Sequence, residues 1–169
     1  MEKLRFMLIG CGRISKNHIA AAAANQDSMT LAVVCDPVRE RAEAKAAMLR
    51  EQAGYDALVY TDYKQALAEQ QIDVCAIATE SGFHAGIALD CIAHGKHVLV
   101  EKPMALSTKD AQAMIHAAEE KGVTLGVCHQ NRFNAPIQQL HKALDDGRFG
   151  KLVNGTARIL WNRTLPYYT

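Results

Sequence analysis

The sequence lacks the features that mark membrane-spanning, secreted or nucleic-acid-binding proteins. No run of about 18 apolar residues occurs, so no segment has the length of a transmembrane helix. The opening apolar run is too short for a signal peptide. The net charge is +1 with 22% charged residues, and this balance argues against a dedicated partner of nucleic acid or of a membrane surface. We therefore expect a cytoplasmic protein that binds neither nucleic acid nor membranes.

Paired cysteines are also lacking. The five cysteines form no C-x-x-C spacing, and three of them lie within or at the ends of apolar runs. This pattern is typical of buried thiols in a reducing compartment, and it excludes a disulfide framework as the basis of the fold. The seven histidines show no metal-ligand spacing, so the sequence predicts no metal site.

What the sequence does contain is a regular alternation of strand-like and helix-like segments. The apolar runs expected to be strands are 6–9, 30–35, 58–60, 74–78, 97–100 and 123–128. The helix boundaries are predicted from Asp62 and Ser107 as N-caps, Pro37 in the first helical turn, and Gly54, Gly95 and Gly122 as stops. Six strands alternating with helices predict an α/β fold with a doubly wound parallel sheet of the Rossmann type.

The last part of the chain does not continue this alternation. We expect residues 1–133 to form the Rossmann domain, followed by a linker helix. A long strand is then predicted over 152–161, with no helix after it. Because such a strand has no partner in its own domain, residues 134–169 are interpreted as the start of a truncated C-terminal α/β domain.

The loop Gly10-Cys11-Gly12 lies directly between the first predicted strand and the first predicted helix. The first glycine permits a tight turn, and the second lets the backbone approach a pyrophosphate. The N-terminus of the helix then offers free N–H groups to the anion. The third glycine of the G-x-G-x-x-G pattern is replaced by Ser15, which is small enough to keep helix and strand close. The loop predicts a dinucleotide cofactor.

Asp36 strengthens this prediction. It ends the second strand, 24 positions after Gly12, where an acidic residue commonly binds the adenosine ribose. A carboxylate there repels a 2′-phosphate, so NAD is favoured, while the nearby Arg39 and Arg41 keep NADP possible. The alternative is that Asp36 only caps the helix that follows.

Lys102 lies in Glu101-Lys102-Pro103, directly after the fifth strand. Residues at this end of an open α/β sheet face the ligand. A lysine there can donate a hydrogen bond to a substrate hydroxyl, or lose a proton if it is desolvated. The alternative is an ordinary exposed loop lysine.

At this point the motifs together resemble one known family. The segments 10–14, 79–84 and 101–103, with Asp36 between them, are similar in order and spacing to the glucose–fructose oxidoreductase/inositol dehydrogenase/MocA family. The resemblance implies an N-terminal Rossmann domain, a C-terminal α/β domain with a large open sheet, and hydride transfer between a sugar or polyol and a nicotinamide cofactor.

The resemblance also implies residue roles. Lys102 would be the catalytic lysine, and the bond before Pro103 is expected to be cis. The expected cofactor contacts are Gly10, Gly12, Arg13, Ile14, Asp36, Thr79, Ser81, His84, Glu101, Gln130, Asn131, Trp161 and Arg163. Where many members of the family carry Thr-Pro-Asn, this chain has Thr79-Glu80-Ser81, so Ser81 would replace the usual asparagine only in part.

A closer resemblance is carried by the segments 128–134, 147–150 and 161–163. They are similar to UDP-N-acetyl-glucosaminuronic acid 3-dehydrogenases of bacterial surface-polysaccharide synthesis. This implies a nucleotide-sugar substrate, which Lys102 and Arg132 would contact, and a homo-oligomer assembled through the missing second domain. The alternatives are an inositol or other sugar dehydrogenase of the same family, or a non-catalytic NAD-binding module.

Three of these side chains have alternative roles. Arg132 suits a diphosphate or carboxylate, but it could instead form an ion pair with Glu101 or Asp145. Trp161 could serve only for interdomain packing, and His84 could be a local capping group. His18, on the first helix, is interpreted as structural.

Overall fold

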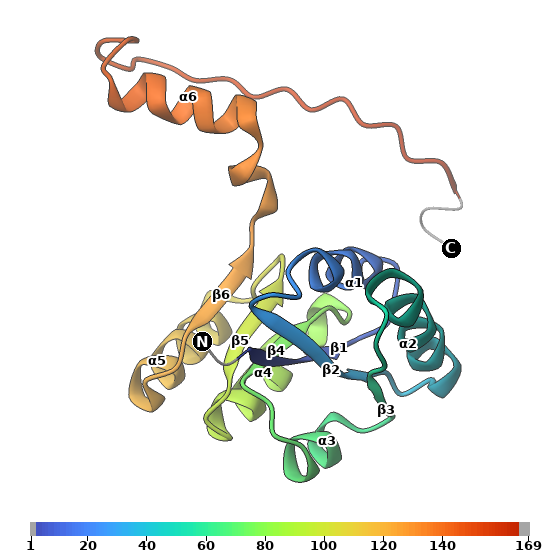
Figure 1. Ribbon diagram of the computed structural model, residues 1–169. Coiled ribbons are helices and arrows are strands. Elements are labelled where there is room, and N and C mark those ends of the chain that lie inside the picture. Colours follow the sequence, from blue (N-terminus) through green and yellow to red (C-terminus); the bar gives the residue numbers. More distant parts are fainter. Residues whose placement is uncertain (1–2, 166–169) are drawn as a thin grey trace. The chain divides into compact units, whose positions relative to one another are not determined.

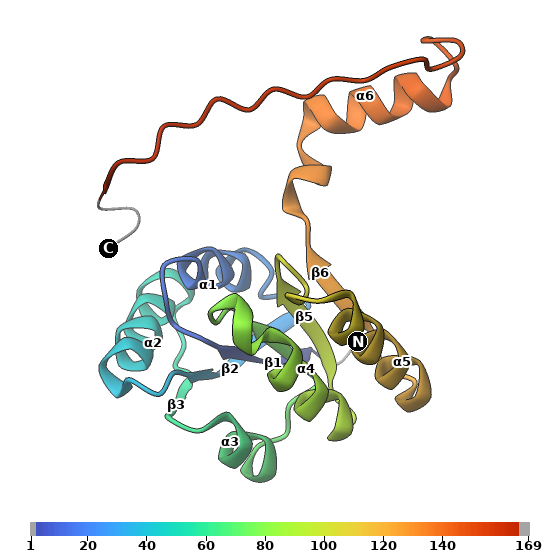
Figure 2. The same ribbon diagram turned by 180° about the vertical axis from the view of Figure 1, so that it is seen from behind.

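The computed structural model describes residues 3–165, and the chain divides into two compact units between His129 and Gln130. The first unit is a six-stranded sheet with helices against both of its faces (Figures 1 and 2). The strands are β1 Leu4–Ile9, β2 Met29–Cys35, β3 Leu58–Tyr60, β4 Val74–Ile77, β5 His97–Glu101 and β6 Leu125–Cys128. The helices of this unit are α1 Ser15–Ala24, α2 Arg39–Ala53, α3 Tyr63–Glu69, α4 His84–Ala93 and α5 Thr108–Lys121, with the 3-10 turn η1 Ser81–Phe83.

The strand order is β3-β2-β1-β4-β5-β6, and every neighbouring pair is parallel. This order confirms the predicted doubly wound Rossmann sheet. The chain reverses its winding direction between β1 and β4. In open α/β sheets, ligands bind at this switch point, outside the carboxyl ends of the strands.

Two separate cores hold the helices against the sheet. Successive side chains of a strand point to opposite faces, so Met7 and Leu8 of β1 belong to different cores. Leu8 packs in the cluster on one face of the sheet, which includes Ile19 of α1 and Leu49 of α2. Met7 packs with the other cluster, which includes Ile92 of α4. Burial on both faces explains why the strands are continuous apolar runs.

Helix ends follow the predicted chemistry with one exception. Asp62 and Ser107 accept hydrogen bonds from backbone N–H groups of the helices that they begin, as predicted. The second helix, however, begins at Arg39 and not at Pro37. The reason is that Asp36 Oδ1 accepts the N–H of Val38 at 2.9 Å. Val38 is held in an extended conformation, so the helix begins only at the next residue.

The second unit contains the 3-10 turn η2 Gln130–Phe133 and helix α6 Ala135–Asp145, which carries a proline in its first turn. The strand predicted over 152–161 is wrong for the described chain, because residues 152–161 carry no strand there. A strand needs a neighbour to pair its N–H and C=O groups. Val153 and Leu160 are 92% and 85% exposed, so this apolar segment has no packed face. That residues 134–169 begin a second α/β domain stays a prediction.

Across residues 3–165, none of the helices is both long and apolar enough to span a membrane.

Candidate functional site

The two glycines of the loop after β1 differ in their surroundings. Gly10 has φ +95°, and a Cβ atom there would lie 2.6 Å from the carbonyl carbon of Ala78. Only glycine fits, because the backbone of β1 passes directly against the end of β4. A Cβ on Gly12 would meet nothing within 4 Å. Gly10 is therefore required by the fold, whereas the open space at Gly12 is available to a ligand.

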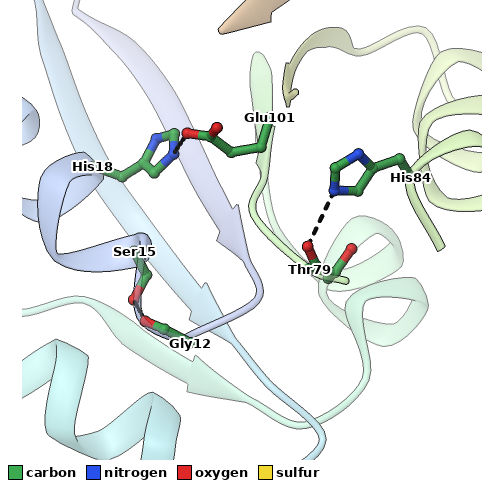
Figure 3. A network of polar contacts seen from close by, with 6 residues as sticks. All are labelled: Gly12, Ser15, His18, Thr79, His84 and Glu101. Atoms are coloured by element: carbon green, nitrogen blue, oxygen red, sulfur yellow. Dashed lines mark hydrogen bonds and ion pairs between the residues drawn. The ribbon is translucent and has the colours of Figure 1, made fainter. Parts of the chain in front are cut away.

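Ser15 fills the position of the missing third glycine. Its side chain is fully buried, and its hydroxyl donates to the carbonyl of Gly12 at 2.6 Å (Figure 3). The residue before α1 is Ile14, which provides no side-chain cap for the helix. The first N–H groups of α1 are thus left without a side-chain cap, which suits an anion.

Asp36 is bound at both carboxylate oxygens. Oδ2 accepts the N–H of Cys11 at 2.8 Å, and Oδ1 accepts the N–H of Val38. The side chain is buried, with the residue 6% exposed. Asp36 therefore holds the loop between the two glycines, a role that the sequence did not reveal. The N–H of Val38 precedes α2, which begins at Arg39 and has no side-chain cap, so the alternative that Asp36 caps this helix is wrong. Its contact with a ribose stays a prediction.

Most of the predicted site residues of the first unit meet at one edge of the sheet. They follow four strands whose carboxyl ends lie at the same edge, because the sheet is parallel. Gly10, Gly12, Arg13 and Ile14 follow β1; Asp36 follows β2; Thr79 and Ser81 follow β4; Glu101 ends β5 and Lys102 follows it. The fold thus brings together residues that are up to 92 positions apart (102 minus 10).

His84 lies at the start of α4, and its ring is buried. Nδ1 lies 2.8 Å from the carbonyl oxygen of Pro103, and Nε2 lies 3.1 Å from that of Thr79 (Figure 3). The side chain connects the loop after β4 to the loop after β5, and it does not cap α4. Its predicted contact with the cofactor stays a prediction.

Glu101, Lys102 and Pro103 differ in their environments. Glu101 is buried and pairs with His18 of α1 at 3.0 Å between Oε1 and Nε2 (Figure 3). Lys102 is exposed, and its contact with substrate stays a prediction. The Lys102–Pro103 bond is cis, which confirms the expectation drawn from the family resemblance. The pairing of His18 with Glu101 spans 83 residues, which is why no local pattern indicated it.

The cysteines near this edge are poor nucleophiles. All five cysteines are free thiols. Burial, and then the carboxylate of Asp36, raises the pKa of Cys11 to about 12. Burial, and then Glu101, raises the pKa of Cys128 to about 11. Both thiols are protonated at neutral pH, so the site does not support thiolate catalysis.

The remaining predicted residues belong to the second unit. Gln130, Asn131 and Arg132 lie on η2 and are exposed. The guanidinium of Arg163 lies 4.6 Å from the ring centroid of Trp161, a cation–π contact. The contacts predicted for these five residues with cofactor or substrate stay predictions. Of the carboxylates considered as partners of Arg132, Glu101 pairs with His18 and Asp145 pairs with His141.

Comparison with known proteins agrees with this geometry. Residues 4–129 match the GFO_IDH_MocA family, described as an oxidoreductase family with an NAD-binding Rossmann fold. Among solved structures, the WlbA dehydrogenase from Bordetella pertussis in complex with NADH and UDP-GlcNAcA is 38% identical, with a TM-score of 0.88; the alignment covers 99% of this chain and 49% of that one.

Two curated relatives act on other substrates. D-apiose dehydrogenase from Paraburkholderia graminis is 33% identical over 150 residues, which is 89% of this chain and 38% of that protein. Inositol 2-dehydrogenase from Salmonella typhimurium is 26% identical over 166 residues, which is 98% of this chain and 48% of that protein. The chain therefore spans half or less of the length of these proteins.

Proposed function

Because the chain belongs to the GFO_IDH_MocA oxidoreductase family through residues 4–129, we propose that its first unit holds NAD with the pyrophosphate against Gly12. The observation that carries this proposal is the contrast between the two loop glycines. Gly10 is forced by the close backbone of Ala78, whereas Gly12 borders open space beside the N-terminus of α1. Bare backbone next to a helix N-terminus is the arrangement that binds a pyrophosphate.

Asp36 is proposed to select NAD. Each of its carboxylate oxygens accepts one backbone N–H and keeps a second lone pair for a ribose hydroxyl. Its negative charge, held in a buried position, disfavours the 2′-phosphate of NADP. Arg39 and Arg41 lie just after this point in the chain, and NADP stays the second candidate.

For the whole protein we propose the oxidation of a sugar hydroxyl. The cofactor, when bound, supplies the hydride acceptor. Lys102 is exposed after β5, and we assign it to the reacting hydroxyl, where its ammonium group can stabilise developing negative charge or relay the proton. His84 and Pro103 fix the backbone next to it.

The proposed substrate is a nucleotide-linked sugar uronate, oxidised at the C3 hydroxyl. The support is the similarity to the WlbA dehydrogenase, which was crystallised with UDP-GlcNAcA. Arg132 would contact the diphosphate or the carboxylate of such a substrate. The second candidate is an inositol or simple sugar, because an inositol 2-dehydrogenase aligns with 98% of this chain.

The cofactor proposal is tested by calorimetry on the 169-residue chain with NAD and NADP. We expect weak binding of NAD, weaker binding of NADP, and no turnover by this chain alone. Absence of heat at millimolar NAD would refute the proposal.

The substrate proposal is tested on the whole protein, by following NADH absorbance with UDP-sugar uronates and with free polyols. We expect the uronates to be oxidised and Lys102→Met to lose that activity while it still binds NAD. Oxidation of polyols alone would favour the second candidate.

A further inference from the structure

Three side chains from different elements converge beside Lys102. His18 of α1, Glu101 at the end of β5 and Cys128 at the end of β6 each offer one ligand atom, and these atoms all lie within 4.8 Å of one another. His18 and Glu101 point toward each other in Figure 3. Among residues 3–165, this is the one group of at least three such side chains with that spacing.

The donor set matches the preferences of one class of ion. An imidazole nitrogen, a carboxylate oxygen and a thiolate sulfur are the three ligand types that Zn²⁺ takes in proteins. Bond lengths of about 2.0–2.3 Å in a tetrahedral site place ligand atoms roughly 3.3–3.8 Å apart. The three atoms therefore need to shift by only about 1 Å to reach this geometry, and His18 Nε2 and Glu101 Oε1 are already 3.0 Å apart.

We propose that His18, Glu101 and Cys128 form a binding site for Zn²⁺ or a similar transition-metal ion, with a fourth position left to water. One carboxylate and one thiolate balance the charge of the ion, so the bound site is neutral. Glu101 is buried, which favours such a neutral arrangement over isolated charges. Cys128 is only half-buried, and this leaves a path for the ion.

Metal binding has to displace a proton from the thiol. Burial and Glu101 raise the pKa of Cys128 to about 11, so the free thiol is protonated. Zn²⁺ binds the thiolate, so binding releases the thiol proton and the free energy of metal binding offsets the cost of this deprotonation. No local pattern indicated the site, because its members are separated by 83 and 27 positions and none belongs to a local ligand motif (101 minus 18 and 128 minus 101).

The test uses Co²⁺ as a spectroscopic probe on the purified chain near pH 8, without NAD. Thiolate ligation gives a sulfur-to-cobalt charge-transfer band in the near ultraviolet, and tetrahedral Co²⁺ gives intense visible bands. We expect both bands to saturate at one ion per chain and to disappear when Zn²⁺ is added. Absence of the charge-transfer band in the unaltered chain would overturn the proposal, whatever the variants do.

Matched variants assign the ligands. Cys128→Ser should abolish the charge-transfer band, and His18→Ala should weaken Co²⁺ binding at least about tenfold. The control is His116→Ala, which removes an exposed histidine paired with Glu120 and should leave binding unchanged. A charge-transfer band that persists in Cys128→Ser would place the metal on another cysteine and refute the site. Because the assay contains no NAD, failure here leaves the cofactor proposal unaffected.

Discussion

His84 and Pro103 are joined by a hydrogen-bond contact of 2.8 Å between the ring Nδ1 and the backbone carbonyl oxygen. The second ring nitrogen lies 3.1 Å from the carbonyl of Thr79, so one buried ring spans the loops after β4 and β5. These loops carry Thr79, Ser81 and Lys102 of the proposed site. The ring thus keeps two parts of the site in register.

Replacing this histidine should destabilise the fold. We expect His84→Ala to lower the free energy of unfolding by about 2–4 kcal/mol, because it leaves a cavity in place of a buried ring and removes the ring's contacts with the carbonyls of Thr79 and Pro103. Urea denaturation measures this, and amide hydrogen exchange at Lys102 and Met104 should become faster.

The control is His94→Ala. The Nδ1 atom of His94 also lies 2.8 Å from a carbonyl, that of Asp90, but this ring is exposed. His94→Ala should lower the free energy of unfolding by no more than about 0.5 kcal/mol. Equal costs for the two variants would show that His84 does not hold the loops together.

The two loop glycines separate folding from binding. A methyl group at Gly10 would overlap the backbone of Ala78 and Thr79, which cannot move without disturbing the sheet. We expect Gly10→Ala to lower the free energy of unfolding by about 3 kcal/mol or more. Gly12→Ala meets open space, so its stability should change by less than about 1 kcal/mol.

For NAD binding the expectation is different. Gly12→Ala should bind NAD at least about tenfold more weakly, because the added methyl group keeps the pyrophosphate away from the backbone. Calorimetry on the folded variant measures this. If Gly12→Ala binds NAD as well as the unaltered chain does, the pyrophosphate does not rest at this glycine.

Asp36 should control cofactor choice. We expect Asp36→Asn to reduce the free energy of unfolding by about 1–3 kcal/mol, because the amide nitrogen cannot accept one of the two N–H groups now bound. Removal of the charge should also raise the affinity for NADP relative to NAD by about tenfold. The ratio of the two dissociation constants is the measurement.

Asp62→Asn provides the comparison, since Asp62 also accepts a backbone N–H, that of Lys64, at the start of α3. It should leave the cofactor ratio unchanged. An unchanged ratio in Asp36→Asn as well would remove Asp36 from the ribose site.

The strands and helices of the first unit could be predicted from the sequence, because each is encoded by a local pattern of residues. Apolar runs such as 74–78 predict buried strands, and the loop with Gly10 and Gly12 indicates where the first strand ends and the first helix begins. The strand predicted over 152–161 was wrong for a physical reason: its apolar pattern is real, but a strand forms only where another segment pairs with it.

The contacts within the site were beyond sequence reasoning. The bond from Cys11 to Asp36 and the pairing of His18 with Glu101 join residues 25 and 83 positions apart. Such pairs depend on how the strands are ordered in the sheet, and no local spacing encodes them. Lys102 was foreseeable because its place after a strand is itself a local feature.

A last prediction concerns the pH dependence of stability at the contact between α3 and α4. Tyr63 Oη donates to Asp90 Oδ2 at 2.6 Å, and Lys64 Nζ lies 3.0 Å from the same oxygen. The hydrogen bond from Tyr63, and then Lys64, holds the pKa of Asp90 below the ordinary value of an aspartate, about 3.9. A depressed pKa in the folded state means that the stabilisation is complete above pH 4 or so, and is lost as the pH falls through the folded-state value.

Tyr63→Phe should therefore lower the free energy of unfolding more at pH 7 than at pH 3. The cost at pH 7 should be about 1 kcal/mol, less than for a fully buried charged pair, because Asp90 is 38% exposed and water screens it. Urea denaturation at both pH values gives the difference. In Tyr55→Phe the lost bond is to the uncharged N–H of Leu31, so its cost should not vary between these pH values. If both variants show the same dependence on pH, the carboxylate of Asp90 is not the group that Tyr63 stabilises.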